Sequence, residues 1–537
     1  MGVPGLTSWL YANYSTFSVS TVAQGGGGQQ RSFDHIHFDM NSFLHEVIKK
    51  GAKNTEEVMA DTVSAVMEVL DILRPLKSLS FCYDGPTPHA KILHQRQRRL
   101  RQSELEQQIT PGSTLMYEVE EGVTKSVAKR LSWCPELSVV LSGCGVPEEG
   151  EIKIAQRIAQ CAAVEGPNPS HCVIGCDSDL FLICTAAVSC VNISWYSPFF
   201  EKRLLCCGSV FRSWIDANSI PDLKFLETLR SLRLDFVALA LFAGNDYFGE
   251  VSGYSVGGSW GAYLKGRAEG GEWGLTRVHP TNYSIGLCKA NLAAFLRYLY
   301  PALNTVGSSE LEYAPYVVKY LKSVAWSLTT LSQGRCPSFG FVNDKFTPAV
   351  RELVLVLESA DETIHKGRWI RAPPERPGSG PLLPLVHYCL VIRNKNLLPT
   401  AVWKAQALST ESFPSDIAAA AEEVAQCFDE ATATKREKMK LSFDVWRSCT
   451  PRQYKALVPL EEVTKKSASL KGNNANFLKF VPSVKGPLAS KSIHVKSEGI
   501  EQCTAVAKIV EAGSIIKRKK RGREVMAPST LSMSEEL

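Results

Sequence analysis

Hydrophobic and polar residues follow strand-like patterns at four places in the first third of the chain. The stretches HIHFDMN (35–41) and LSFCYDG (79–85) alternate apolar with polar residues and then reach Asn or Gly. LSVVLSG (137–143) and HCVIGCDSD (171–179) are continuous apolar runs that end at Gly or Asp. Alternation predicts strands with one covered face, and short apolar runs are typical of strands covered on both faces, as in a parallel sheet.

Helix-like periodicity separates these strands. In residues 57–73 and 151–164, apolar residues recur at steps of three and four, which predicts helices with one buried face. Strands that alternate with helices form βαβ units. The pattern therefore predicts an α/β fold with an open, mostly parallel central sheet flanked by helices, then a mainly helical C-terminal region and a disordered tail.

Composition bounds the class of protein. The chain has 537 residues, of which 45% are hydrophobic and 21% charged, and a net charge of +6, as in an ordinary globular protein of more than one compact unit. No apolar run reaches the roughly 20 residues of a membrane span, and the N-terminus lacks a secretory signal. The 16 cysteines include no CxxC pair, and Cys172 with Cys176 is a weak zinc signal. We expect an intracellular, soluble protein with reduced thiols.

Carboxylates follow the predicted strands. The strand ends, the start of the helix at 151 and the end of an apolar helix (LDFVALALFAGND, 234–246) supply Asp39, Asp84, Glu149, Glu151, Asp177, Asp179 and Asp246. The carboxyl ends of parallel strands share one edge of a sheet, where ligands bind. Two carboxylates about 5 Å apart repel by about 3 kcal/mol at an effective dielectric of about 20, so this set must take up protons or a cation. Ligands that are all oxygen favour Mg²⁺ or Mn²⁺.

Each acid also has an ordinary explanation. Glu148, Glu149 and Glu151 stand where a helix begins, and acidic residues are favoured there by the helix dipole. Asp84 could be a turn residue. All of these explanations must hold at once if the acids are unrelated, whereas one metal site accounts for the whole set. One or two ions there would activate a water molecule against a phosphodiester.

A basic stretch follows Asp84. The segment DGPTPHAKILHQRQRRLR (84–101) is helical in pattern after its prolines, and Lys91, Gln95, Arg98 and Arg99 fall on one face. Such a face binds a phosphate through bidentate arginines and a lysine charge. The alternative is a solvated basic helix. Its start at the same sheet edge as the acids favours the phosphate pocket.

Seven blocks together resemble the Xrn family of 5′→3′ exoribonucleases, within the PIN/flap-nuclease superfamily. In order they are MGVPGLTSWL, DMNSFLH, YDGPTPHAKILHQRQRRLR, ITPGSTLM, SGCGVPEEGEIKI, GCDSDLFL and DFVALALFAGNDYF, over the first half of the chain. The resemblance implies a PIN/flap-nuclease-like fold that hydrolyses single-stranded RNA with a 5′-monophosphate to mononucleotides, in RNA decay or processing. It implies that the seven acids are the metal ligands. It also implies that the pocket for the 5′-phosphate is formed by Lys91, Gln95, Arg98 and Arg99. It places His45 against the first base.

We expect three regions. The resemblance implies a nuclease core at 1–265 and a helical second region at 266–465 that completes the core, and the composition predicts a disordered basic tail at 466–537. The sequence departs from the family in a glycine-rich loop after Asp246, YFGEVSGYSVGGSWG, and in the absence of a later aromatic block. Trp446 is a poor substitute for that block and is expected in the core. These departures keep one alternative open, a catalytically weak or inactive RNA-binding scaffold of the same fold. A structure-specific flap-type DNA nuclease is a further alternative.

The tail contains KRKKRGR (517–523). Such a run can direct a protein to the nucleus or bind RNA nonspecifically. We expect a nuclear protein, with the cytoplasm as the alternative. We expect no membrane partner, and the sequence does not name a protein partner.

Overall fold

The computed structural model describes residues 2–14, 19–21, 31–131, 137–199, 202–220, 225–271, 273–279, 284–301, 312–343, 346–359, 367–375, 380–409, 416–433 and 476–480. All of them belong to one compact unit, Met1–Ile493. The tail run 517–523, Trp446 and nearly all of the expected tail at 466–537 lie outside the described residues.

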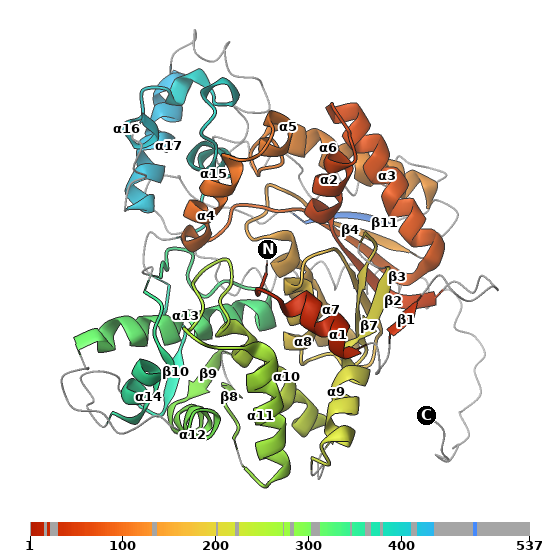
Figure 1. The fold of residues 1–537 in the computed structure, drawn as a ribbon. Helices are drawn as coiled ribbons and strands as arrows, with labels where there is room; N and C mark the ends of the chain where they lie inside the picture. The colour runs from red at the N-terminus through yellow and green to blue at the C-terminus, as the bar shows by residue number, and fades with distance from the viewer. Residues whose placement is uncertain are drawn as a thin grey trace. The chain divides into compact units, whose positions relative to one another are not determined.

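The central sheet has eight strands. They are β1 (Val19–Thr21), β2 (Arg31–Asp39), β3 (Leu73–Cys82), β4 (Ser138–Ser142), β5 (His171–Ile174), β6 (Ile193–Ser197), β7 (Arg203–Cys206) and β11 (Asn476–Phe480). Their order is β1-β7-β6-β5-β2-β3-β4-β11, and the run from β6 to β11 is parallel throughout. Only the pairings of β7 with β6 and with β1 are antiparallel among the described strands of this sheet. The predicted open, mostly parallel sheet is confirmed (Figure 1).

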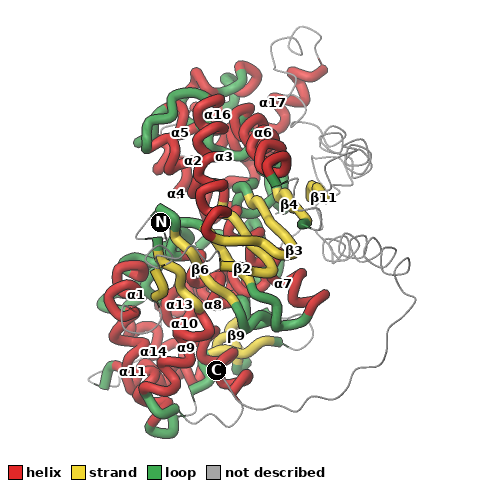
Figure 2. The backbone as a smooth tube through the Cα atoms, turned by 90° about the vertical axis from the view of Figure 1, so that its right-hand side faces the viewer, coloured by secondary structure: helices red, strands yellow, loops and turns green. Residues whose placement is uncertain are grey.

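Helices cover both faces of the sheet. Those up to residue 241 are α1 (Leu6–Tyr14), α2 (Met40–Lys49), α3 (Thr55–Ile72), α4 (His89–Arg99), α5 (Glu104–Gln107), α6 (Thr114–Arg130), α7 (Gly150–Glu165), α8 (Asp179–Ala186), α9 (Cys207–Ala217) and α10 (Phe225–Leu241). Helices α2, α3 and α6 share one apolar cluster with the sheet, and α7, α8 and α10 share another. Figure 2, turned from the first view, shows the strands running between these helices.

The alternating directions of the side chains along β2 and β5 explain this layering. Phe38 and Ile174 point into the cluster beneath α2 and α3, whereas Val173 joins the cluster beneath α7 and α8. Each of these side chains is fully buried. Because successive residues of a strand face opposite sides, both faces of the sheet need apolar cover, and the continuous apolar run of β5 follows from that need.

The rest of the chain adds helices and a second sheet. The helices are α11 (Val256–Ala268), α12 (Lys289–Leu299), α13 (Ala314–Gln333), α14 (Val350–Glu358), α15 (Pro384–Val391), η2 (Lys395–Leu397), η3 (Thr400–Val402), α16 (Gln406–Ser409) and α17 (Ile417–Ala433). The second sheet is antiparallel, in the order β10-β9-β8. Its strands are β8 (Thr276–Val278), β9 (Ile285–Cys288) and β10 (Trp369–Arg371). The sequence patterns did not predict this sheet.

The boundary expected at residue 265 falls inside α11. The apolar cluster that includes α8 also includes Leu296 of α12 and Val324 of α13, so the packing continues across that position. Helices α15 and α17 form a separate cluster with Ile92 of α4. Across the described ranges, no helix is long and apolar enough to span a bilayer.

Candidate active site

A pocket of about 390 Å³ lies at the carboxyl ends of the central strands. Six of the seven predicted acids line it: Asp39, Asp84, Glu149, Glu151, Asp177 and Asp246. The seventh, Asp179, is the first residue of α8, two positions after Asp177. Lys91, Arg98 and His45 of the predicted substrate-binding set line the same pocket.

Chain topology explains why the acids gather. Strand β2 ends at Asp39, Asp84 stands two residues after β3, and Asp177 lies in the turn between β5 and α8. Glu149 is the residue that precedes the first turn of α7, and Glu151 is within that turn. Parallel strands deliver their carboxyl ends to the same edge, so residues separated by more than a hundred positions meet there.

Two of the acids are held firmly by neighbours. Asp84 accepts a hydrogen bond from the backbone N–H of Gly150 at 2.8 Å and another from the Asn41 side chain at 2.8 Å. Asp39 accepts a bond from the Ser42 hydroxyl. A Cβ at Gly150 would lie only 3.0 Å from Oδ1 of Asp39, so glycine allows the start of α7 to approach both aspartates.

Burial and neighbouring charges raise the pKa of several of these carboxyl groups. Burial and then the charges of Asp84 and Asp177 raise the pKa of Asp39 to about 7. Burial and then the charge of Asp177 raise the pKa of Asp179 to about 8. The pKa of Glu151 lies well above its ordinary value, through burial and then Asp179. These shifts mean that the carboxylates hold more negative charge than the protein compensates, as expected of a cation site.

Lys91 compensates part of that charge. Its ammonium forms an ion pair with Glu149, and its Nζ lies 3.0 Å from Oδ2 of Asp246. Although burial opposes charge, these two acids hold the pKa of Lys91 well above its ordinary value. Lys91 therefore lies among the predicted metal ligands as a resident cation, rather than in a purely cationic phosphate pocket.

The predicted basic face of α4 divides in two. Arg98 lines the pocket, and its Nε is buried with no hydrogen-bond partner. Gln95 and Arg99 do not line it; they are 3% and 2% exposed. Each residue of an α-helix is rotated by 100° from the one before it. Around the axis of α4, Gln95 and then Arg99 therefore lie between Lys91 and Ile92, and the side chain of Ile92 packs against α15.

Interior partners occupy both of these side chains. Oε1 of Gln95 lies 3.1 Å from Nε2 of His387. The Arg99 guanidinium donates to the Thr110 hydroxyl at 2.9 Å and to the Ile109 carbonyl at 2.7 Å. Burial lowers the pKa of Arg99 to about 9. In this structure Arg99 supports the loop after α5 and Gln95 contacts α15. Their predicted contact with a phosphate stays a prediction.

Besides Asn41 and Ser42, two residues that were not predicted from the sequence contact the acids. Tyr247, the first residue of the divergent loop, donates its hydroxyl hydrogen bond to Oε2 of Glu149 at 2.7 Å. Its ring packs edge-on against Trp326, with centroids 4.9 Å apart. Nδ1 of His94 lies 3.8 Å from Oδ1 of Asp246. Its position three residues after Lys91 on the same helix was the available signal.

The carboxylate oxygens fit a hard divalent cation in kind, but they are spread around the pocket. In the described ranges, the one group of three potential ligands whose donor atoms all lie within 4.8 Å of one another is His35, Cys161 and Glu165. That group lies toward the other end of β2 from Asp39, and Lys77 already pairs with its Glu165 at 2.7 Å. Rotation of the acidic side chains would be needed to bring the pocket's oxygens around an ion.

Comparison with known proteins relates part of the chain to one family. Residues 1–108 and 104–191 match the family described as the XRN 5'-3' exonuclease N-terminus. The chain is 26% identical over 312 residues to a 5'-3' exoribonuclease 2 of Gallus gallus, covering 46% of this chain and 33% of that protein. It is 30% identical over 282 residues to a 5'-3' exoribonuclease 2 of Debaryomyces hansenii, covering 43% and 26%. The chain thus spans about a third or less of the length of these relatives.

Two solved structures are also similar. The catalytic core of Rad2 in complex with a DNA substrate has a TM-score of 0.30 and 17% identity, and the match covers 57% of this chain and 75% of that one. The T5 D15 protein co-crystallized with metal ions has a TM-score of 0.28 and 12% identity, with 57% and 87% covered.

Proposed function

Because the N-terminal region of this chain belongs to the Xrn family of 5′-3′ exonucleases, we propose that the protein is a metal-dependent 5′→3′ exoribonuclease. Its substrate would be single-stranded RNA with a 5′-monophosphate, which it would hydrolyse to mononucleotides in RNA decay or processing. The observation that carries the proposal is the pocket that six acids from five separate segments line together with Arg98 and His45.

The acidic half of the pocket is the place for one or two Mg²⁺ or Mn²⁺ ions. The proposed ligands are the seven acids of the predicted set. Burial and then neighbouring carboxylates raise the pKa of three of them, Asp39, Glu151 and Asp179, and a bound cation would offset both effects. When bound, such ions lower the pKa of a water molecule and stabilise the oxygen that leaves the phosphodiester. Tyr247 fixes the orientation of Glu149 through its hydrogen bond.

The basic half of the pocket would select the 5′ end. Arg98 has an unpaired buried Nε and is the proposed contact for the terminal phosphate. Lys91, which pairs with two of the proposed metal ligands, is the proposed second contact. Gln95 and Arg99 would position α4 through their contacts with the protein interior. His45 is the proposed stacking partner of the first base. We expect a 5′ cap or triphosphate to be too bulky for the terminal-phosphate contacts.

The test is digestion of 3′-labelled RNAs that differ only in a 5′-monophosphate or 5′-hydroxyl end, with Mg²⁺ or with EDTA. We expect mononucleotide release from the 5′-monophosphate RNA with Mg²⁺ alone. Asp177→Ala should abolish it, and Asp216→Ala, at an exposed position of α9, should not. Equal digestion of both ends would reject the phosphate pocket, and no product from either RNA would reject the enzyme.

An RNA-binding scaffold of the same fold is the second candidate. It is favoured by the Lys91 ammonium, which already pairs with two of the proposed ligands. Tight RNA binding that Asp177→Ala leaves unchanged, with no product in any metal, would establish it. A third candidate, a flap-type DNA nuclease, would prefer branched DNA over linear RNA in direct competition.

We also propose a nuclear location, which rests on the run KRKKRGR at 517–523. Replacement of its basic residues by glutamine in a fluorescent fusion should move the protein to the cytoplasm. An unchanged distribution would mean that the run serves another purpose, such as nonspecific RNA binding.

A further inference from the structure

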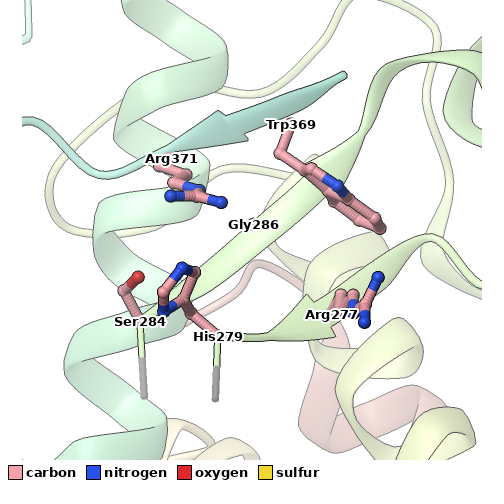
Figure 3. A pocket seen from close by; sticks show the side chains of 6 residues that line it. All are labelled: Arg277, His279, Ser284, Gly286, Trp369 and Arg371. Atoms are coloured by element: carbon pink, nitrogen blue, oxygen red, sulfur yellow. The ribbon is translucent and has the colours of Figure 1, made fainter. Parts of the chain in front are cut away.

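The second sheet has one buried and one open face. On the buried face, Ile285, Leu287 and Ile370 are at most 1% exposed and belong to the main apolar cluster. On the open face lies a hollow of about 210 Å³ (Figure 3). Its lining shares no residue with the lining of the acidic pocket.

A glycine between two arginines creates this hollow. Gly286 of β9 stands directly opposite Arg277 of β8 on one side and Arg371 of β10 on the other. Residues in register on neighbouring strands point to the same face, so the two guanidinium groups flank a position with no side chain. Figure 3 shows the two arginines on either side of Gly286.

An aromatic ring borders the same hollow. Trp369 is two residues before Arg371 on β10, and both line the hollow. Its indole is partly exposed and has two guanidinium groups near its ring: Cζ of Arg277 is 5.9 Å from the ring centroid and Cζ of Arg368 is 5.5 Å from it.

This surface carries three exposed positive charges. All three arginines are exposed, the residues that line the hollow include no carboxylate, and no acid of the described ranges forms a salt bridge with these arginines. Paired guanidinium groups match a phosphate in geometry and charge. An exposed tryptophan beside them matches an unpaired base, which stacks on aromatic side chains.

We propose that this hollow, lined by Arg277, Gly286, Trp369 and Arg371, binds one nucleotide unit of single-stranded RNA outside the acidic pocket. The phosphate lies between the two arginines over Gly286, and the base packs against Trp369. The choice of RNA rests on the proposed exoribonuclease function. The choice of a single strand rests on Trp369, because a base within a duplex cannot stack on a side chain. The site gives a long substrate a second hold while its 5′ end is in the acidic pocket.

The test measures the affinity of the full-length protein in EDTA for a fluorescent 5′-hydroxyl RNA, by anisotropy at several salt concentrations. A 5′-hydroxyl end removes the contribution of the proposed terminal-phosphate contact. Arg277→Gln with Arg371→Gln should weaken binding about tenfold or more and lower the salt slope by about 1. Trp369→Ala should weaken binding about fivefold or more with an unchanged salt slope.

Two further variants separate shape and general charge from the site itself. Gly286→Val fills the hollow and leaves every charge in place; its Cβ would lie 3.4 Å from Cβ of Trp369, an ordinary contact. It should weaken binding like the double arginine variant, with unchanged circular dichroism and melting temperature. Lys129→Gln with Arg130→Gln removes two exposed charges at the end of α6 and should have little effect.

The proposal is overturned if the double arginine variant binds like the Lys129 and Arg130 control, or if a duplex of equal length binds as tightly as the single strand. Its failure can be told apart from failure of the proposed function. A 5′-monophosphate dinucleotide should be hydrolysed by Arg277→Gln/Arg371→Gln at the wild-type rate, whereas long RNA should show a raised KM. If the wild type hydrolyses neither, the enzyme assignment fails and the binding measurements still decide this inference.

Discussion

Removing the charge of Lys91 should destabilise the metal-free protein. Its Nζ pairs with Glu149 and lies 3.0 Å from Asp246, and all three side chains are at most 7% exposed. Lys91→Met keeps most of the apolar stem and deletes the ammonium. The carboxylates then lose the one ammonium that pairs with two of them among the described residues.

The magnitude follows from Coulomb's law and from buried ion pairs. A pair of unit charges at the Lys91–Asp246 distance of 3.0 Å attracts by about 5 kcal/mol at an effective dielectric of about 20. Loss of one partner of a buried pair typically costs about 3–5 kcal/mol. We therefore expect the free energy of unfolding to fall by about 3–5 kcal/mol in EDTA. Mg²⁺ should restore about 2.7 kcal/mol at a concentration of about 100 Kd.

The assay is urea unfolding of wild type, Lys91→Met and Lys265→Met, each in EDTA and in Mg²⁺. Lys265 is a matched control, because it is 70% exposed and lies 3.9 Å from Glu269 in a surface pair, which contributes at most about 1 kcal/mol. If Lys91→Met unfolds at the wild-type urea concentration in EDTA, the acids do not depend on that charge, and the electrostatic account of the pocket is refuted.

Three other predictions concern the scaffold. Arg233→Met should destabilise the protein by about 3 kcal/mol or more in urea unfolding, because the buried guanidinium donates to four backbone carbonyls of residues 184–190 that would be left unpaired. The control Arg230→Met, at an exposed position of the same helix, should destabilise the protein far less, and equal effects of the two substitutions would contradict this prediction. Gly112→Ala should lower the melting temperature by several degrees, since glycine has φ +96° there and a Cβ would lie 2.2 Å from the Pro384 carbonyl oxygen; an unchanged melting temperature would show that the contact is not needed. Burial lowers the pKa of His171 to about 3, below its unfolded value of about 6.5, so the neutral imidazole contributes fully to stability above pH 6.5 and less as the pH falls. Between pH 6 and 4, the free energy of unfolding of the wild type should fall by about 1.4 kcal/mol per pH unit more than that of His171→Gln. Parallel pH profiles of the two proteins would contradict this role of His171.

The central sheet and the gathering of the acids could be predicted from the sequence. The four predicted strands overlap β2, β3, β4 and β5, because burial on both faces leaves long apolar or alternating runs. The helix predicted at 151–164 is observed at Gly150–Glu165. Since the acids stand directly at the ends of these elements, a correct prediction of the strands also predicts that the acids meet at one edge of the sheet.

The second sheet and the two sides of α4 could not be predicted in the same way. Strands β8, β9 and β10 have three or four residues each, and β10 follows β9 only after about 80 residues of chain, so no alternation long enough to recognise exists. On α4, the sequence spacing predicts how far apart Lys91 and Arg99 lie around the helix axis. It does not predict which of these side chains face the pocket and which face α15, because that depends on packing with residues about 290 positions away.

Mn²⁺ binding followed by electron paramagnetic resonance tests the central claim most directly. The full-length wild type should bind at least one Mn²⁺ that Mg²⁺ displaces, and Glu149→Gln with Asp177→Asn should lose it. Glu165→Gln, in the separate group with His35 and Cys161, should bind Mn²⁺ like the wild type. Binding that survives the double substitution in the pocket, or disappears with Glu165→Gln, would contradict the account.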